Sequence, residues 1–479
     1  MLDADGMCGV CGRILHRKGL VIMDSIAEYM QFINSKAQWK HELGFRVDRL
    51  PEFLFPFQRF LVEWALNKGR AAIFADCGLG KTAMQLSWAN EVIRKENKPV
   101  LLLTPLAVGA QTVAEAEKFG IDAKRTRDGV FDGSKVIWVT NYEQLHKYDP
   151  NGFSGVVCDE SSSIKDFKSE RKKTVVEFLR TIKYRLLCTA TAAPNDFFEL
   201  GTSSEALGLL GFRDMITTFF KMETSKDIHG WGRTKYRFRG HAESPFWSWV
   251  CSWARSMRMP SDLGFCDEGF ILPQLIESEF VVETEKKRDG MLFAMPGKTL
   301  QDERKERRNS ISERVEKAAS IVSNHDGVSV CWCELNDEAD MLESVIPNSV
   351  QVSGSMSDDE KEYRLTAFSS GDIPCLITKP KIGAWGLNWQ HCSNIVTFPS
   401  HSYEQYYQAI RRCFRFGQKR AVNVSIIVNE GEVGMLENLR RKGSQSDRMF
   451  SEIVAHMKDA MHLTTTDAFL EKEVIPSWL

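Results

Sequence analysis

A glycine-containing segment has the residue types and spacing of a phosphate-binding loop. It lies between the apolar run 71–74 and an amphipathic stretch from residue 83, and it reads Ala75-Asp76-Cys77-Gly78-Leu79-Gly80-Lys81-Thr82. In such a loop the glycines let backbone N–H groups turn toward phosphate oxygens, Lys81 contacts the outer phosphates and the Thr82 hydroxyl binds Mg²⁺. A chance glycine turn before a helix is the alternative, which Lys and Thr in register disfavour. The strict pattern has Gly where this chain has Ala75.

Two adjacent acids supply the other half of a nucleotide-hydrolysing site. Asp159 and Glu160 directly follow the apolar run 155–158. Asp159 would hold Mg²⁺ together with Thr82, while Glu160 would polarise the attacking water, because phosphoryl transfer needs a metal holder and a water-positioning group. An isolated Asp-Glu pair after a strand is more often a helix cap on a solvated edge. Downstream of a phosphate loop, the catalytic interpretation is favoured.

The elements that must position these residues follow the pattern of a parallel sheet covered by helices. Between residues 53 and 210, short apolar runs alternate with amphipathic stretches, which predicts an α/β lobe. Its strands are predicted at 71–74, 100–103, 136–139, 155–158 and 184–188. Ligands in such sheets bind at the carboxyl ends of the strands, where the loop and the acids lie.

The same alternation returns after residue 274 and predicts a second α/β lobe. A charged helix is expected through 304–315, followed by strands at 327–332, 349–352, 374–378, 394–398 and 422–428. The stretch 211–273 lacks this alternation of apolar runs and amphipathic stretches. It is interpreted as a bridging or inserted subdomain, with Trp247, Trp249 and Trp253 in its core. A helix is expected at 24–30, so residues 1–22 are treated as a leader without assigned chemistry.

The bulk composition excludes some classes of protein. A net charge of -2 gives no global attraction to phosphate backbones, so nucleic-acid contacts would need local clusters of the 62 Lys and Arg. No apolar run approaches the roughly 20 residues of a membrane-spanning helix, and no secretory signal precedes the cysteines. Cys8, Cys11 and His16 resemble half of a zinc site, but a second ligand pair is missing nearby. A protein of the cytoplasm is expected.

These motifs, in this order, resemble those of superfamily-two helicases and, among them, of the Swi/Snf-like translocases. Besides the loop at 75–82, the first-lobe matches are Leu103-Thr104-Pro105, Thr140-Asn141-Tyr142-Glu143, Asp159-Glu160-Ser161-Ser162 and Thr189-Ala190-Thr191-Ala192-Ala193-Pro194-Asn195. The resemblance implies that 103–105 and 140–143 track nucleic acid and that 189–195 couples hydrolysis to lobe movement. It also implies an adenine-reading segment at 56–58, in which Gln58 bonds the base and an aromatic such as Phe57 stacks on it.

The resemblance continues in the second lobe. Residues 385–389 resemble the fifth family motif, and 408–418 the sixth, which implies that Gly386 and Gln408 touch the nucleotide. Arg412 and Arg415 fall three apart and are expected on one helical face, so both guanidinium groups can reach a shared target across a cleft. They are the expected arginine fingers, with a basic solvated helix as the alternative.

One position departs from the family pattern. Arg411 occupies a place where the family usually has glycine. The extra cation would either contact DNA or crowd the nucleotide site, and the sequence leaves both open.

The fold implied by the resemblance is two tandem RecA-like lobes with a bridging or inserted subdomain. Residues 1–22 would be the leader and 23–210 the first, ATP-binding lobe with a helical lead-in. The bridging subdomain would take 211–273 and the second lobe 274–479.

The function implied by the resemblance is that of an ATP-dependent DNA helicase or translocase, which couples Mg-ATP hydrolysis to movement on single- or double-stranded DNA. It would act as a monomer on DNA, with protein partners in DNA metabolism and no membrane, in a bacterial or phage-infected cell. Two alternatives stay open, an RNA-directed helicase and a nucleotide-dependent subunit that recruits a nuclease or methyltransferase. The segment 231–240 alternates cations with aromatics, as either a DNA contact or an exposed basic hairpin would.

Overall fold

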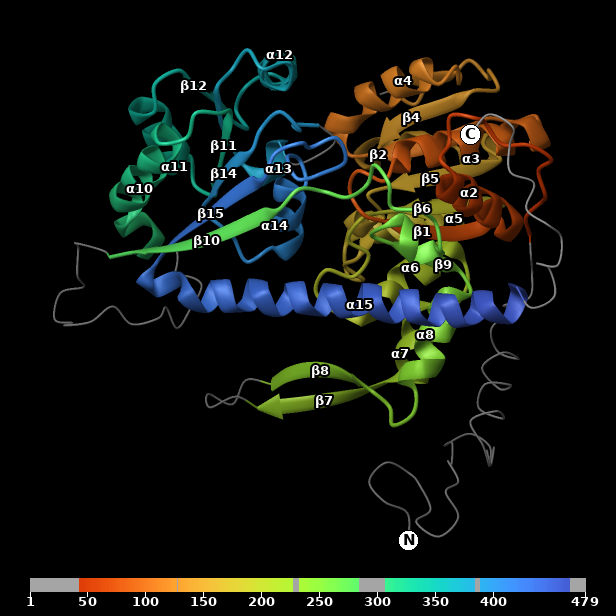
Figure 1. Ribbon diagram of the computed structural model, residues 1–479. Helices are drawn as coiled ribbons and strands as arrows, with labels where there is room; N and C mark the ends of the chain where they lie inside the picture. The colour runs from red at the N-terminus through yellow and green to blue at the C-terminus, as the bar shows by residue number, and fades with distance from the viewer. Residues whose placement is uncertain (1–42, 127, 227–231, 284–305, 384–387, 466–479) are drawn as a thin grey trace, which may run out of the picture.

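The computed structural model describes residues 43–126, 128–226, 232–283, 306–383 and 388–465 (Figure 1). These residues form a seven-stranded sheet in the order β3-β4-β2-β5-β6-β1-β9, a six-stranded sheet in the order β10-β15-β14-β11-β13-β12, and a two-stranded hairpin. Every strand pair in the two large sheets is parallel. The predicted class of two RecA-like α/β lobes is confirmed.

The first sheet forms because its central strands are short apolar runs that can be buried on both faces. Its strands are β1 Arg70–Ala75, β2 Val100–Thr104, β3 Ala123–Arg125, β4 Ile137–Asn141, β5 Gly155–Asp159, β6 Tyr184–Cys188 and β9 Ala254–Met257. The helices of this lobe are α2 Pro56–Lys68, α3 Lys81–Glu96, α4 Gly109–Lys118, α5 Glu170–Leu179 and α6 Leu200–Leu207. Five short 3-10 helices connect them in the described part, η1 Leu106–Val108, η2 Tyr142–Lys147, η3 Pro150–Gly152, η4 Ser161–Ile164 and η5 Phe197–Glu199.

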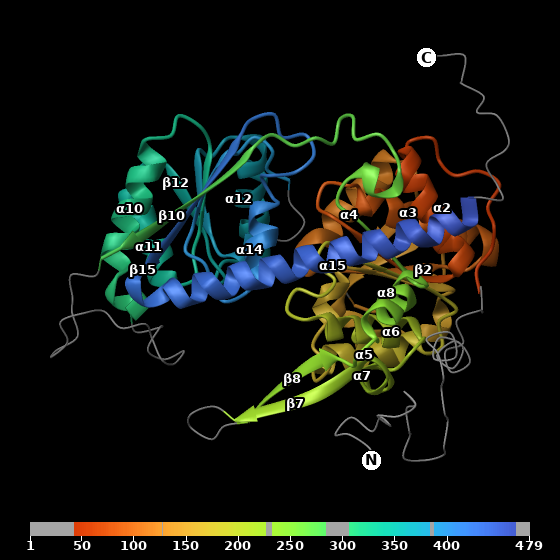
Figure 2. The same ribbon diagram turned by 60° about the horizontal axis from the view of Figure 1, so that its bottom comes forward.

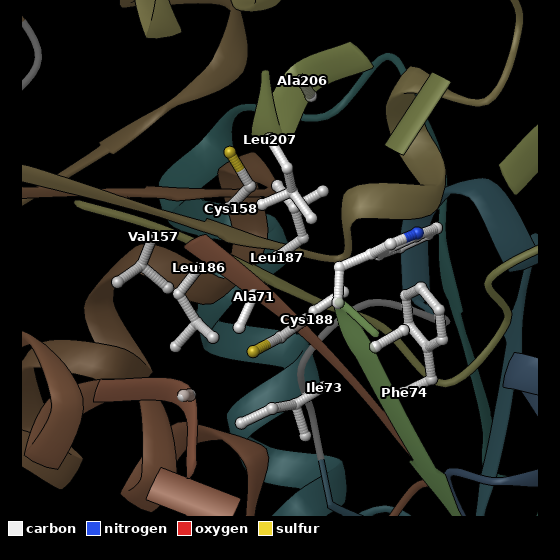
Figure 3. Packing of buried hydrophobic residues seen from close by; sticks show 14 of the residues in the cluster. Ala71, Ile73, Phe74, Val157, Cys158, Leu186, Leu187, Cys188, Ala206 and Leu207 are labelled. Atoms are coloured by element: carbon white, nitrogen blue, oxygen red, sulfur yellow. The ribbon is translucent and has the colours of Figure 1, made fainter. Parts of the chain in front are cut away.

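The core of this lobe lies where β1, β5 and β6 meet. Ile73, Val157 and Leu186 are fully buried and lie near one another in the close view (Figure 3). The five predicted strands of this lobe are confirmed. The edge strands β3 and β9 were not predicted, because Ala-Lys-Arg and Ala-Arg-Ser-Met carry too few apolar residues to stand out.

The second sheet is built in the same way. Its strands are β10 Leu275–Val282, β11 Ser329–Trp332, β12 Ser349–Val352, β13 Cys375–Thr378, β14 Asn394–Thr397 and β15 Val422–Asn429. Its helices are α10 Ile311–Ser323, α11 Asn336–Val345, α12 Asp358–Ser370, α13 Pro380–Gly383 and α14 Tyr403–Ile410, with the 3-10 helix η7 Glu430–Glu432. The five predicted strands are confirmed, while β10, a largely exposed edge strand beside β15, was missed.

The stretch 211–273 contributes to more than one part of the molecule. It contains α7 Phe212–Phe219, the hairpin strands β7 Phe220–Lys226 and β8 Gly232–Phe238, α8 Glu243–Cys251, β9 and the 3-10 helix η6 Pro260–Leu263. The hairpin projects from the body (Figure 1), whereas β9 pairs with β1 as an edge of the first sheet. Trp247, Trp249 and Trp253 are buried, as expected. The domain boundaries themselves stay a prediction.

A single long helix joins the two lobes. Helix α15, Val433–Thr465, extends along both of them (Figure 2). Met435 and Leu436 at its start belong to a core cluster of the second lobe, and Phe450 and Ile453 pack into the core of the first. At about 1.5 Å per residue, its 33 residues reach roughly 50 Å. The apolar residues that pack into the two cores are far apart along this helix, so the sequence did not reveal that the helix connects the two lobes.

Several expectations lie outside the described residues. They are the leader 1–22 with Cys8, Cys11 and His16, the helix at 24–30, and Gly386. Trp231 of the basic-aromatic segment also lies outside them, and DNA contact by that segment stays a prediction.

Candidate nucleotide site between the lobes

The phosphate-binding loop has a backbone that glycine alone adopts without strain. Gly78 has φ +89° and Gly80 φ +73°, in the left-handed region. A Cβ on Gly80 would lie 2.3 Å from Gln58 Nε2, and one on Gly78 would lie 2.8 Å from Phe416 N. The loop therefore needs glycine for its conformation and for the close approach of neighbours from both lobes.

Lys81 begins α3 directly after the loop. Its Nζ donates to the carbonyl oxygens of Ala75, at 3.0 Å, and of Asp76, at 3.3 Å. The amine thus lies over the inside of the loop, and Thr82 is half-buried beside it. Both side chains lie at the start of α3, next to the loop.

Gln58 connects the adenine segment to the loop. Its Nε2 donates to the carbonyl oxygen of Leu79 at 2.9 Å, and its Oε1 accepts from the N–H of Phe55 at 3.0 Å. Phe57, the expected stacking residue, is only 2% exposed and packs against Phe270, so it presents almost no surface to a base. Phe55 and Phe416 are 45% and 38% exposed, and their ring centroids lie 6.5 Å apart. The burial of Phe57 corrects the expectation and leaves these two rings as the accessible aromatics.

The acid pair ends β5 in a buried pocket. Gln85 of α3 donates to Asp159 Oδ1 at 2.7 Å, and the Thr189 hydroxyl donates to Glu160 Oε2 at 3.1 Å. Glu160 has φ +47°, a conformation that a non-glycine residue adopts at a cost. The structure therefore holds both carboxylates in fixed directions at the carboxyl end of the sheet.

Burial makes Asp159 a costly anion in the ligand-free protein. Burial and, next, the charge of Glu160 raise the pKa of Asp159 to about 6. An unfolded aspartate titrates near 3.9, so the folded chain binds an extra proton between about pH 4 and 6 and loses stability as pH rises through that window.

Asp159→Asn is therefore expected to stabilise the ligand-free protein at pH 8 by about 2 kcal/mol and much less at pH 4, while it abolishes ATP hydrolysis. Thermal unfolding without nucleotide or Mg²⁺ at the two pH values measures the difference. Asp48→Asn, at an exposed bend, is the matched surface control. Equal destabilisation by Asp159→Asn at both pH values would show that the carboxylate carries no electrostatic cost.

Segment 189–195 links the acids to the second lobe. Thr189 bonds Glu160, and two residues later the Thr191 hydroxyl donates to Glu404 Oε1 of α14 at 3.4 Å. Lys165 of the first lobe forms an ion pair with the same Glu404 carboxylate. The sequence had no signal for Lys165 or Glu404, because their roles depend on how the two lobes meet.

Gln408 lies one helical turn after Glu404 and has unmet hydrogen-bonding capacity. It is fully buried, and within the described residues neither its Oε1 nor its Nε2 has a hydrogen-bond partner. Buried amides are nearly always satisfied, so such an orphan indicates a missing ligand or water. Together with the glycine-lined loop, this orphan shows that the residues present fit a bound Mg-nucleotide.

Arg412 and Arg415 lie against the loop and the acids. Burial lowers the pKa of Arg412, whereas the nearby Glu160 and Asp159 act in the opposite direction. Burial and then Arg412 lower the pKa of Arg415 to about 10. A Cβ on Gly78 would lie 3.4 Å from the Cβ of Arg415. The two arginines of the second lobe are thus brought to the first-lobe site.

The expected helical face for this pair is wrong. Helix α14 ends at Ile410, and residues 411–417 form turns. The carbonyl oxygen of Arg412 accepts a hydrogen bond from the N–H of Trp389 at 2.9 Å, and not one from a later residue of a continuing helix. Convergence of the two arginines therefore comes from tertiary contacts.

Comparison with known proteins finds relatives among helicases. Residues 313–417 match the helicase conserved C-terminal domain. Protein p41 of Acyrthosiphon pisum secondary endosymbiont phage 1 is 23% identical over 415 residues, which is 74% of this chain and 87% of that protein. SWI/SNF-related matrix-associated actin-dependent regulator of chromatin subfamily A-like protein 1 of Xenopus tropicalis is 26% identical over 261 residues, or 52% of this chain. These similarities support a Swi/Snf-like helicase of superfamily two.

The Swi/Snf-like chain differs in extent from its eukaryotic relatives. It covers 25% of the Xenopus protein, and it matches only 6% of TATA-binding protein-associated factor MOT1 of Saccharomyces cerevisiae, at 28% identity over 122 residues. The similarity supports a helicase-type ATPase. The activities and partners of the longer relatives do not transfer with the shared part.

A cleft of about 840 Å³ lies between the lobes of this Swi/Snf-like helicase, lined by residues of both. Pro105, Tyr142 and Glu143 on its wall belong to the two segments that the sequence predicted to track nucleic acid. Its charged lining comes from both lobes, with the cations Arg125, Arg171, Lys361 and Lys381 and the acids Glu143 and Glu362, of which Glu143 pairs with Arg171. Among the described residues, no helix is long and apolar enough to cross a membrane.

Proposed function

We propose that this Swi/Snf-like helicase couples Mg-ATP hydrolysis to movement on DNA. The observation that carries the proposal is the meeting of two half-sites. The loop and acids belong to the first lobe and the arginine pair to the second, with a cation-lined cleft spanning the same two lobes. The rate of ATP hydrolysis and the binding of a DNA strand would then both depend on closure of the two lobes.

Each group of the site has a distinct task in this proposal. Lys81 and the loop N–H groups would hold the β- and γ-phosphates, and Thr82 and Asp159 would hold Mg²⁺, which would supply charge neutralisation at the phosphates. Glu160 orients the attacking water and takes up its proton. Arg412 and Arg415 neutralise the charge that develops on the transferring phosphate.

Movement follows from differential binding. Thr191 and Lys165 reach Glu404 across the lobes, so the acid pair and α14 are linked through Thr189. A strand in the cleft would be held differently when the lobes close and when they part, and ATP can drive stepping only through that difference.

The test is the stimulation of ATP hydrolysis by single-stranded DNA, duplex DNA and RNA at a fixed salt concentration. DNA is expected to raise the rate at least about tenfold, a usual extent of allosteric coupling. Stimulation by RNA alone would assign an RNA-directed helicase. A rate that no nucleic acid changes, but that a nuclease or methyltransferase partner raises, would assign the recruiting role.

The cations of the cleft give a separate prediction. Lys361→Ala combined with Lys381→Ala is expected to weaken DNA binding about tenfold near 0.1 M salt and to reduce the salt dependence by about two released counterions, because two phosphate contacts are lost. Fluorescence titration of DNA at several salt concentrations measures both. Lys317→Ala on α10, whose amine lies over Phe280, is the matched control. Identical salt slopes for the double variant and the parent would remove the cleft from the DNA path.

A further inference from the structure

Arg411, the residue that departs from the family pattern, is bonded to the phosphate-binding loop. Its Nη2 lies 2.6 Å from Asp76 Oδ2, and the two side chains are 16% and 4% exposed. Asp76 is the first residue after β1, whereas Arg411 follows α14. The contact is therefore a nearly buried ion pair between the lobes, and neither of the two roles left open by the sequence describes it.

The Asp76 carboxylate collects three donors. Besides Arg411, it accepts from the Tyr407 hydroxyl at 2.5 Å and from the N–H of Cys77, within the loop, at 2.7 Å. The Arg411 guanidinium also lies over the Tyr407 ring, 5.1 Å from its centroid. One side chain thus fixes the start of the loop and binds two groups of the other lobe.

The Asp76–Arg411 ion pair lies at the phosphate-binding loop, where charge affects the binding of phosphates. A lone carboxylate at Asp76 would repel the phosphates that the loop must hold, and Arg411 cancels that charge. Burial disfavours the charged guanidinium, but the charge of Asp76 and the Tyr407 hydroxyl outweigh it and raise the pKa of Arg411. The ion pair therefore persists throughout the neutral range. Removing one partner of a buried pair leaves an uncompensated charge, which costs more than removing both.

We propose that Asp76, Tyr407 and Arg411 form an inter-lobe latch that positions the phosphate-binding loop for hydrolysis. The inference rests on the proposed function, since it assumes that the loop binds ATP. Arg411 is a positioning residue, which acts through Asp76. When the lobes close, the latch forms and fixes the conformation of the phosphate-binding loop. The same closure brings Arg412 and Arg415 to the site, so the loop is ordered whenever the arginines are in place.

The latch predicts a particular split of kinetic constants. Arg411→Gln is expected to lower kcat about 10- to 100-fold, because closure no longer fixes the loop, and to raise KM for ATP several-fold, because Asp76 is left unpaired. Asp76→Asn combined with Arg411→Gln removes the stray charge, so KM should return to within about twofold of the parent while kcat stays low. Arg411→Lys should recover part of kcat, since the ammonium keeps the charge without the planar fork.

A double-mutant cycle with DNA-stimulated ATP hydrolysis tests this, with thermal unfolding to show that each variant folds. Tyr407→Phe serves if Arg411→Gln does not fold, and it should lower kcat about tenfold by removing one hydrogen bond to the charged Asp76 carboxylate. Arg448→Gln breaks the exposed pair with Glu243 between α15 and α8 and is the matched control, expected within about twofold of the parent.

The outcomes separate the latch from the site it serves. The latch would be overturned if the fold-changes in kcat and KM caused by Asp76→Asn and by Arg411→Gln simply multiply in the double variant. It would also be overturned if the variants keep the kcat and KM of the parent. If Lys81→Ala also hydrolyses ATP normally, the proposed nucleotide site fails with it. If Lys81→Ala is inactive while the Arg411 and Tyr407 variants behave as the parent, the latch alone is refuted.

Discussion

Lys81→Ala is expected to abolish ATP hydrolysis and leave the protein folded. The Lys81 amine donates to the carbonyl oxygens of Ala75 and Asp76 in the described part of the chain, so truncation would remove a phosphate contact without opening the core. A positioned cation at the transferring phosphate is worth several kcal/mol, so the rate should fall by at least about 1,000-fold. Steady-state ATP hydrolysis with saturating DNA measures the loss, and circular dichroism with thermal unfolding verifies the fold.

The control for this change lies on the same helix. Lys95 is near the carboxyl end of α3, where its amine lies over Phe45, far along the helix from the loop. Lys95→Ala should keep the parent rate. Hydrolysis by Lys81→Ala at the parent rate would mean that the loop at 75–82 does not hold the reacting phosphates.

Arg412→Ala and Arg415→Ala are each expected to lower kcat by about 1,000-fold or more, in the range that arginine fingers contribute. Their effect should appear in the chemical step, because guanidinium groups beside the transferring phosphate would stabilise charge that develops only in the transition state. Arg412 should matter more, since it is the one that interacts with Glu160 and Asp159. Single-turnover hydrolysis, together with an independent measurement of ATP binding, separates the two steps.

Lysine substitutions refine this second expectation. Arg412→Lys keeps the charge but loses the planar fork, so it should recover a small part of the rate. Arg440→Ala on α15, which breaks a surface pair with Glu279, is the control and should have little effect. A kcat within about threefold of the parent for both alanine variants would show that the second lobe supplies no catalytic cation.

The sequence predicted the parts of the fold that local pattern determines. The strands β1, β2, β4, β5 and β6 are apolar runs of ordinary length, and each was predicted within one or two residues. Strand β9 reads Ala-Arg-Ser-Met and joins the sheet only because β1 offers a free edge there. Helix α15 serves two cores, which a periodic pattern along one segment cannot reveal.

The site shows a similar division. Residue types and spacing sufficed to nominate Lys81, Asp159 and Glu160, and the structure places them at one end of the first sheet. Phe57 was misjudged because burial depends on Phe270, more than 200 positions away in the chain. Arg411 was recognised as a departure, but its partner Asp76 belongs to the other lobe. Contacts made across lobes were the ones that the sequence could not supply.

The central claim is that ATP hydrolysis drives movement along DNA, and displacement of a third strand from a DNA triplex tests it most directly. A motor that tracks the duplex should remove the third strand in the presence of Mg-ATP, and neither the parent without ATP nor Lys81→Ala with ATP should do so. For single-stranded DNA, the corresponding test is displacement of a protein that is bound to the strand and blocks movement along it. Rapid DNA-stimulated hydrolysis by the parent, with the third strand and the block both left in place, would contradict the account.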